Sequence, residues 1–268
     1  MKKQRFDPYS NYYYKVNIKK SRKAKFLTIL FVLLSLSIVI FFSISFSNFL
    51  TISKIVNVNS NFIFEGKTLY AISLETHASL SNAQTKSEEI KKQGGAGFVL
   101  NNGANEFKVL TSVYEEEKDA KRVKTNLENS GNSVEIIKLE MPAFNFKINL
   151  SSSSSNILSN AINMFYLNYK SLYNLSIDYD SGKTDLTSLK SSLISLKQNN
   201  EDIITEFNNK FNKSSNIYVL YVKIYIKQAN EIIKELEIKD ESINISSEIK
   251  YAYCKIINAY LDLYNEML

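Results

Sequence analysis

Side chains suited to catalysis or metal binding are few in this 268-residue chain, which has one histidine, His77, and one cysteine, Cys254. A zinc site of the usual kind needs several His or Cys ligands, and an activated nucleophile needs a base beside it. Cys254 lies beside Tyr253 and Ile257 at helical spacing, which predicts a small buried residue. No pair of carboxylates has a spacing that suggests acid–base work. The sequence therefore predicts no enzyme, no metal and no cofactor.

The stretch Gly94 to Leu110 holds four of the seven glycines and is the next candidate for chemistry. A phosphate-binding loop has a strand before its glycines and a helix after them. Here the helical pattern comes first and the strand pattern second, so nucleotide binding is not predicted. We expect Gly94 to end a helix in the left-handed conformation and Gly103, in "NNGAN", to lie in a hairpin turn.

The N-terminal end has a strong charge asymmetry. Residues 1–25 contain nine Lys or Arg and one acid, Asp7, whereas residues 26 to 53 contain no charged residue. This apolar stretch is long enough to cross a bilayer as a helix, and it is longer than the apolar part of a cleavable signal peptide, which is the alternative. Basic flanks stay in the cytoplasm. The sequence predicts a single-pass cell-membrane protein, with a cytoplasmic N-terminus and extracytoplasmic C-terminal domains.

The basic tail also explains the net charge of the chain. The tail contributes +8 to a net charge of +6, which leaves −2 for all residues beyond it. Cations beside a membrane are attracted to anionic lipid headgroups. The lipid bilayer is therefore a predicted partner, and nucleic acid is not.

An internal repeat lies in the middle of the chain, at an offset of 37 residues. It places "YAISLETH" on "FKVLTSVY", so that Tyr70 falls on Phe107, and Gly94 falls on Gly131. Each copy has the pattern strand, helix, strand, so the repeat predicts a βαββαβ unit with one joint core. We expect both helices on one face of a four-stranded sheet. Strict alternation then places these residues on the open face: Ala71, Ser73, Glu75, Lys108, Leu110 and Ser112.

The C-terminal part is predicted to be helical, because apolar residues recur there at spacings of three and four. Four such runs, separated by turn-forming segments, predict an antiparallel bundle; an extended pair of hairpins or a dimerising bundle fits the pattern equally. The predicted fold class is α+β, with a transmembrane helix, a βαββαβ domain and a helical bundle. The predicted divisions are a tail (1–25), a transmembrane helix (26–50), a linker (51–61), the βαββαβ domain (62–141), a linker (142–155) and the bundle (156–268).

The predicted βαββαβ unit, residues 67–140, resembles the sporulation-related repeat (SPOR) family of bacterial envelope proteins. The resemblance rests on "YAISLETH" and "FKVLTSVY", beside the family's aromatic-x-Val-Gln-Leu-Gly-Ser-aromatic and aromatic-Arg-Val-x-x-Gly-Pro-aromatic strands, and on "NAQTKSEEIKKQGGAGFVL" and "DAKRVKTNLENSG". It implies non-catalytic binding of peptidoglycan glycan strands without stem peptides, in cell division, sporulation or wall remodelling. The residues it assigns to glycan binding are Ser73, Glu75, Thr76, Lys108, Leu110 and Ser112.

Several positions depart from the family pattern. Thr76 stands where the family has serine, and Ser112 with Val113 replaces Gly-Pro. Ser73 stands where the family has glutamine, and Glu75 replaces a glycine. Serine offers fewer hydrogen bonds than glutamine. The alternative function is therefore a protein–protein interaction scaffold of the cell envelope that does not bind glycan. In the glycan-binding interpretation, the helical bundle is available to a protein partner or to a second copy of the chain.

Overall fold

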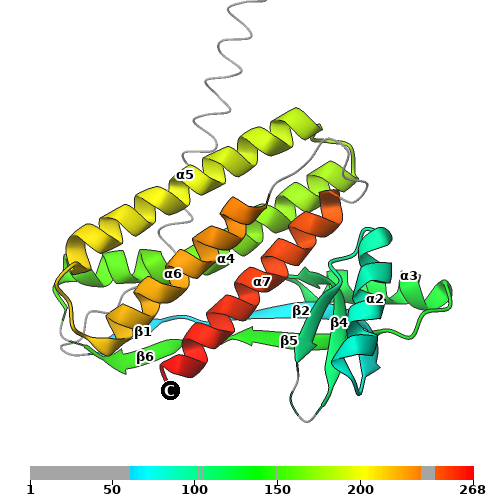
Figure 1. The fold of residues 1–268 in the computed structure, drawn as a ribbon, viewed down its shortest axis with the longest axis horizontal. Coiled ribbons are helices and arrows are strands. Elements are labelled where there is room, and N and C mark those ends of the chain that lie inside the picture. The colour runs from blue at the N-terminus through cyan, green and yellow to red at the C-terminus, as the bar shows by residue number, and fades with distance from the viewer. Residues whose placement is uncertain (1–60, 102, 104, 149, 237–244) are drawn as a thin grey trace, which may run out of the picture. The chain divides into compact units, whose positions relative to one another are not determined.

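Two small sheets and six helices make up the described part of the chain (Figure 1). The computed structural model describes residues 61–268, except 102, 104, 149 and 237–244. The strands are β1 (Asn61–Phe64), β2 (Lys67–His77), β3 (Phe98–Asn101), β4 (Phe107–Tyr114), β5 (Glu135–Met141) and β6 (Phe144–Lys147). The helices are α2 (Leu80–Lys92), α3 (Glu117–Asn129), α4 (Ser152–Asp180), α5 (Leu186–Phe211), α6 (Ile217–Glu235) and α7 (Ile245–Glu266).

The duplicated segment forms an antiparallel sheet with the strand order β3-β4-β2-β5. Its chain order, β2-α2-β3-β4-α3-β5, is the βαββαβ order that the repeat predicts. Helices α2 and α3 pack against one face through a hydrophobic cluster that includes Ile72, Ile90 and Ala120. Equivalent glycines follow the two helices, and both have positive φ, 83° at Gly94 and 85° at Gly131. Both glycines thus have the left-handed conformation expected after a helix.

Bulges shift the side-chain alternation of β2 and β4. The register between these strands changes on both sides of Ser73, and beyond a bulge each side chain points to the other face than strict alternation predicts. Glu75 therefore lies on the helix side, where its carboxylate is 2.7 Å from Nζ of Lys86 on α2. Ser112 also lies on that side, and its hydroxyl donates to the Tyr114 hydroxyl at 3.0 Å. The expectation that Glu75 and Ser112 share the opposite face is wrong for this reason.

The opposite face of the sheet is covered by the bundle, which corrects the expectation of an open face. Leu69, Leu110 and Val113 belong to the same hydrophobic cluster as the bundle core. Helix α7 packs across β3, β4 and β5, on the side away from α2 and α3 (Figure 1). The physical reason is that this face is apolar, and burying each large aliphatic side chain contributes about 1.5–3 kcal/mol.

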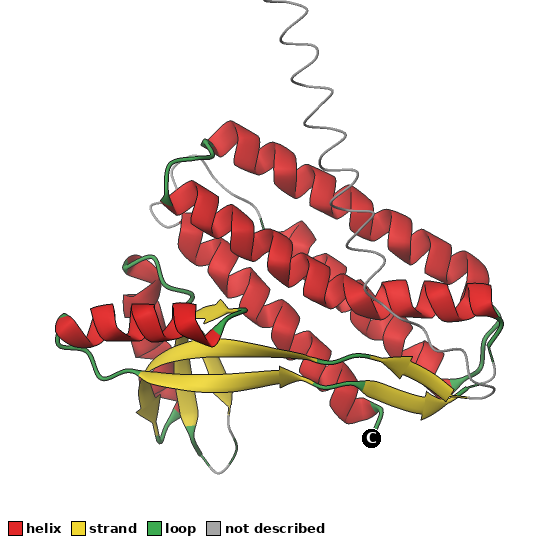
Figure 2. Ribbon diagram, turned by 180° about the vertical axis from the view of Figure 1, so that it is seen from behind, coloured by secondary structure: helices red, strands yellow, loops and turns green. Residues whose placement is uncertain are grey.

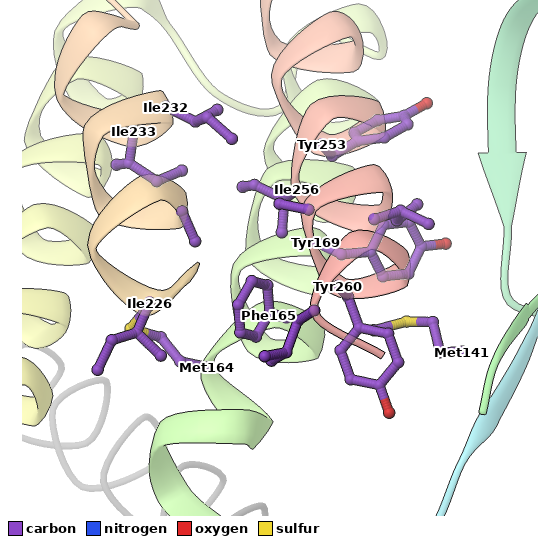
Figure 3. Packing of buried hydrophobic residues seen from close by; sticks show 14 of the residues in the cluster. Met141, Met164, Phe165, Tyr169, Ile226, Ile232, Ile233, Tyr253, Ile256 and Tyr260 are labelled. Carbon is purple, nitrogen blue, oxygen red and sulfur yellow. The ribbon is translucent and has the colours of Figure 1, made fainter. Parts of the chain in front are cut away.

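The four C-terminal helices form a bundle in which α4 packs against α5 and α7, and α6 packs against the same two helices. Side chains cap the starts of three of them: Ser151 accepts from the Ser154 amide, Asp185 from the Ser188 amide, and Asn216 from two amides of α6. Such caps satisfy amides that have no partner inside the helix. Figure 3 shows the aromatic part of the bundle core, where Phe165 and Tyr169 of α4 lie near Tyr260 of α7.

A two-stranded antiparallel ribbon, β1–β6, continues the β2–β5 pair along the bundle (Figure 2). Phe62 stacks on Phe146, and Phe146 stacks in turn on Tyr218 of α6. Gly66 joins β1 to β2 where a Cβ would lie 2.6 Å from the carbonyl oxygen of Met141, so a larger residue does not fit there. Residues 142–155, predicted as a linker, contain β6 and the first turn of α4.

The predicted transmembrane helix and membrane location require correction. Residues 26–50 lie outside the described residues, as does the basic tail. Of the helices that the structure describes, none is both long enough and apolar enough to cross a bilayer. Helix α6, which is rich in isoleucine, still carries five charged residues in 19. The fold is therefore stated as α+β over its described part, without a membrane-spanning helix there.

Candidate functional site

The six residues assigned to glycan binding do not form one surface. Ser73 and Leu110 are opposite one another in the β2–β4 register, and each is 1% exposed beneath the bundle. Thr76 is exposed beside Lys108. Glu75 and Ser112 lie on the helix side of the sheet, as described above. The structure therefore places Ser73, Leu110 and Lys108 on the covered face, with Thr76 exposed beside Lys108, and it separates Glu75 and Ser112 from them.

Lys108 is held in an ion-pair network on that covered face. Its Nζ lies 2.7 Å from a carboxylate oxygen of Glu135 on β5 and 3.4 Å from one of Glu106. The bridge to Glu135 crosses over β2, because β2 lies between β4 and β5. The hydrogen bond to Glu135 raises the pKa of Lys108 above its usual value. Lys108 is buried, so its ammonium satisfies two carboxylates of its own chain and does not point freely to a ligand.

Two tyrosine hydroxyls join the bundle to β4. Strand β3 pairs with β4 only as far as Leu110, so β4 extends beyond its neighbour. At Val113 the backbone N–H donates to the Tyr253 hydroxyl of α7 at 3.3 Å, and the backbone carbonyl accepts from the Tyr169 hydroxyl of α4 at 3.4 Å. Buried backbone groups need such partners. The two tyrosine hydroxyls therefore supply the hydrogen bonds that a longer β3 would otherwise make with Val113.

The glycine-rich turn is a second point of attachment between the sheet and the bundle. The hydroxyl of Ser247 donates to the Gly95 carbonyl at 2.7 Å, and Nζ of Lys250 donates to the Gly94 carbonyl at 2.9 Å. Lys250 also lies 2.9 Å from a carboxylate oxygen of Asp180, at the end of α4. The glycines thus serve a docking role as well as a turn role, which sequence patterns alone do not reveal.

The surroundings of the lone cysteine, Cys254, and the lone histidine, His77, indicate structural roles for both. Cys254 is buried, as the sequence predicts, and burial raises the pKa of its thiol, so the reactive thiolate is disfavoured. His77 lies with its Nε2 3.4 Å from a carboxylate oxygen of Glu75. Within the part of the chain that the structure describes, no three His, Cys, Asp or Glu side chains are grouped so as to hold a metal ion.

A cleft of about 380 Å³ lies where the last turn of α6 meets the first half of α7. Its charged lining is already paired: Nζ of Lys91 lies 4.6 Å from the ring centre of Tyr251, and Lys255 lies 3.6 Å from Glu235. The cleft is a weaker candidate for binding than the surface of α6.

The outer face of α6 carries the described chain's clearest exposed apolar stripe. Ile217, Leu220 and Ile224 are 52%, 38% and 59% exposed, respectively. Their spacing of three and four places them along one side of the helix, opposite the buried Val219 and Ile226. We call these three residues the α6 stripe. The sequence joins the α6 stripe in one apolar run with Ala229 and Ile232, which are buried, so the sequence pattern does not predict this exposure.

Comparisons with protein-family models, with curated proteins and with solved structures found no match. The SPOR resemblance and the functions it implies therefore remain predictions from the sequence.

Proposed function

We propose that this chain is a non-enzymatic protein-interaction module whose α6 stripe binds an acidic amphipathic helix of a partner protein. The observation that supports this proposal most directly is the contiguous exposure of Ile217, Leu220 and Ile224 on a helix that is otherwise well packed. Single exposed apolar residues are ordinary on protein surfaces, whereas a contiguous row marks an interaction site. A partner helix with apolar residues at matching spacing buries such a row.

The charges beside the stripe favour an acidic partner. Lys223 and Lys227 are exposed, lie one turn apart, and form no ion pair with any residue that the structure describes. The nearest acid along the exposed side of α6 is Glu231, one further turn away. Carboxylates on a partner would complement the two lysines and speed its association. Two copies of α6 packed face to face would instead bring like charges together, which disfavours a second copy as the occupant.

The sheet does not supply the binding surface in this proposal. The face that the resemblance assigns to glycan is occupied by α4 and α7, and its polar residues are paired within the chain. A ligand would have to displace the hydrogen bonds of Tyr253 and Tyr169 to reach it. The α6 stripe needs no such rearrangement.

Fluorescence anisotropy on the full chain tests the proposal. The probe is a labelled helical peptide of about five turns, with leucines at positions i, i+3, i+7 and i+10 and glutamates on both flanks. We expect saturable binding that weakens with added salt, because screening reduces the contribution of the lysines. Replacing Ile224 with Glu should weaken binding at least about fivefold, since burial of a half-exposed isoleucine is worth about 1 kcal/mol.

Ile194→Glu is the matched control, because Ile194 on α5 is 66% exposed and lies outside the stripe. This variant should bind the peptide as the unchanged chain does. Equal loss in both variants would overturn the proposal, as would equal binding of a peptide with lysine flanks. Sedimentation that shows a dimer disrupted by Ile224→Glu would assign the stripe to a second copy instead.

A further inference from the structure

Three asparagines lie inside the bundle with unpaired amide atoms. Asn168 of α4, Asn200 of α5 and Asn230 of α6 are each at most 3% exposed. Both side-chain polar atoms of Asn168, the amide nitrogen of Asn200 and the amide oxygen of Asn230 have no hydrogen-bond partner among the described residues. Burying an amide without a partner is costly, so each such group requires an explanation.

The three residues lie at one level of the bundle. Asn168 lies between three and four turns before the end of α4, and Asn200 lies about four turns after the start of α5. Asn200 also lies about three turns before the end of α5, and Asn230 lies between three and four turns after the start of α6. Consecutive helices run in opposite directions and rise about 1.5 Å per residue. The distance of Asn168 from the end of α4 and that of Asn200 from the start of α5 therefore differ by only about 3 Å. The distances of Asn200 from the end of α5 and of Asn230 from the start of α6 also differ by about 3 Å.

The packing of α4 against α6 supports the same placement. Met164 of α4 and Ile226 of α6 are fully buried and lie at the same height in Figure 3. Asn168 and Asn230 each follow one of these residues by four positions, which is about one helical turn. In α5, Asn200 continues the buried row that contains Leu193 and Leu196. All three amides therefore belong to the interior side of their helices.

We infer that these asparagines form a polar layer bridged by internal water. The unpaired atoms include two donors, on Asn168 and Asn200, and two acceptors, on Asn168 and Asn230. No direct hydrogen bond joins them in this arrangement, and a water molecule can donate to the acceptors and accept from the donors at once. Such a layer also aligns the helices, since sliding one helix by a residue would leave its amide among aliphatic side chains.

The inference gives a thermodynamic signature that is measurable by urea unfolding of the full chain. Replacing one asparagine by leucine leaves the other amides with fewer partners, so each single substitution should lower the folding equilibrium constant about tenfold. The triple Asn168→Leu, Asn200→Leu, Asn230→Leu variant removes the whole polar set and should be at least as stable as the unchanged chain. If the three single effects simply added, the folding equilibrium constant of the triple variant would instead fall about a thousandfold.

Asn208 provides the matched control, because it is a partly buried asparagine on α5 two turns beyond Asn200 and also has an unpaired oxygen. The effects of Asn208→Leu and Asn200→Leu should add. Water itself is detected by nuclear Overhauser effects between the side-chain amide of Asn168 and a long-lived water molecule. Additive losses in the triple variant, or no such water contact in a folded chain, would overturn the inference.

Discussion

Removing the Tyr253 hydroxyl tests whether the bundle completes the sheet. Tyr253→Phe keeps the buried ring and deletes only the acceptor of the Val113 N–H, at 3.3 Å. A buried N–H without a partner costs about 1–3 kcal/mol, and the long distance places this bond in the weaker half of that range. We expect the free energy of unfolding to fall by about 1–2 kcal/mol. The companion variant Tyr169→Phe, which frees a carbonyl bonded at 3.4 Å, should cost about 0.5–1 kcal/mol.

Urea unfolding followed by circular dichroism measures both changes, and thermal unfolding should show a drop of about 2–4 °C for each kcal/mol. Tyr225→Phe is the control, because Tyr225 is a half-buried tyrosine of α6 whose hydroxyl makes no hydrogen bond to the residues that the structure describes. It should change stability by less than about 0.5 kcal/mol. If Tyr253→Phe behaves like this control, the hydroxyl does not replace a strand, and the bundle does not complete the sheet through it.

Two further predictions concern pH and glycan. Burial raises the pKa of Tyr253 and Tyr260, and it raises the pKa of Tyr173 to about 12. A group with a raised folded pKa contributes its full stability below its unfolded pKa, near 10 for tyrosine, and loses it above that value at about 1.4 kcal/mol per pH unit. We expect cooperative unfolding above about pH 10, with phenolate absorbance in the ultraviolet rising together with the loss of circular dichroism; phenolate formation in a folded chain would contradict this. Separately, pelleting the full chain with cell-wall sacculi should show no preference for sacculi stripped of stem peptides, because Ser73, Lys108 and Leu110 are buried. Preferential retention on stripped sacculi would restore the glycan hypothesis.

Local patterns were sufficient to predict the order of the duplicated elements. The repeat aligned Gly94 with Gly131, and both follow a helix with positive φ. Alternation failed at Glu75 and Ser112, because a bulge depends on the partner strand as well as on the strand itself. The β1–β6 ribbon was also missed. Its two strands are short, and the whole βαββαβ unit separates them in sequence, so no local signal connects Phe62 with Phe146.

The candidate site was mispredicted for a related reason. The buried role of Cys254 follows from its own helix, and the structure confirms it. Whether Leu110 is exposed or buried depends instead on α7, which lies far from Leu110 in the sequence and packs on it in the fold. A sheet face that holds leucine and valine beside a serine can be a binding surface or a packing surface. Only the position of the later helices decides between them.

The covering of the sheet by the last helix has a consequence for synthesis on the ribosome. Strand β5 ends at Met141 and α7 begins at Ile245, so the sheet is complete well before its cover emerges, by about 5–20 s at ordinary elongation rates. During that interval the apolar face of the sheet is exposed in the nascent chain. Binding of a chaperone to this face, or rapid translation of the intervening codons, would protect the nascent chain from aggregation.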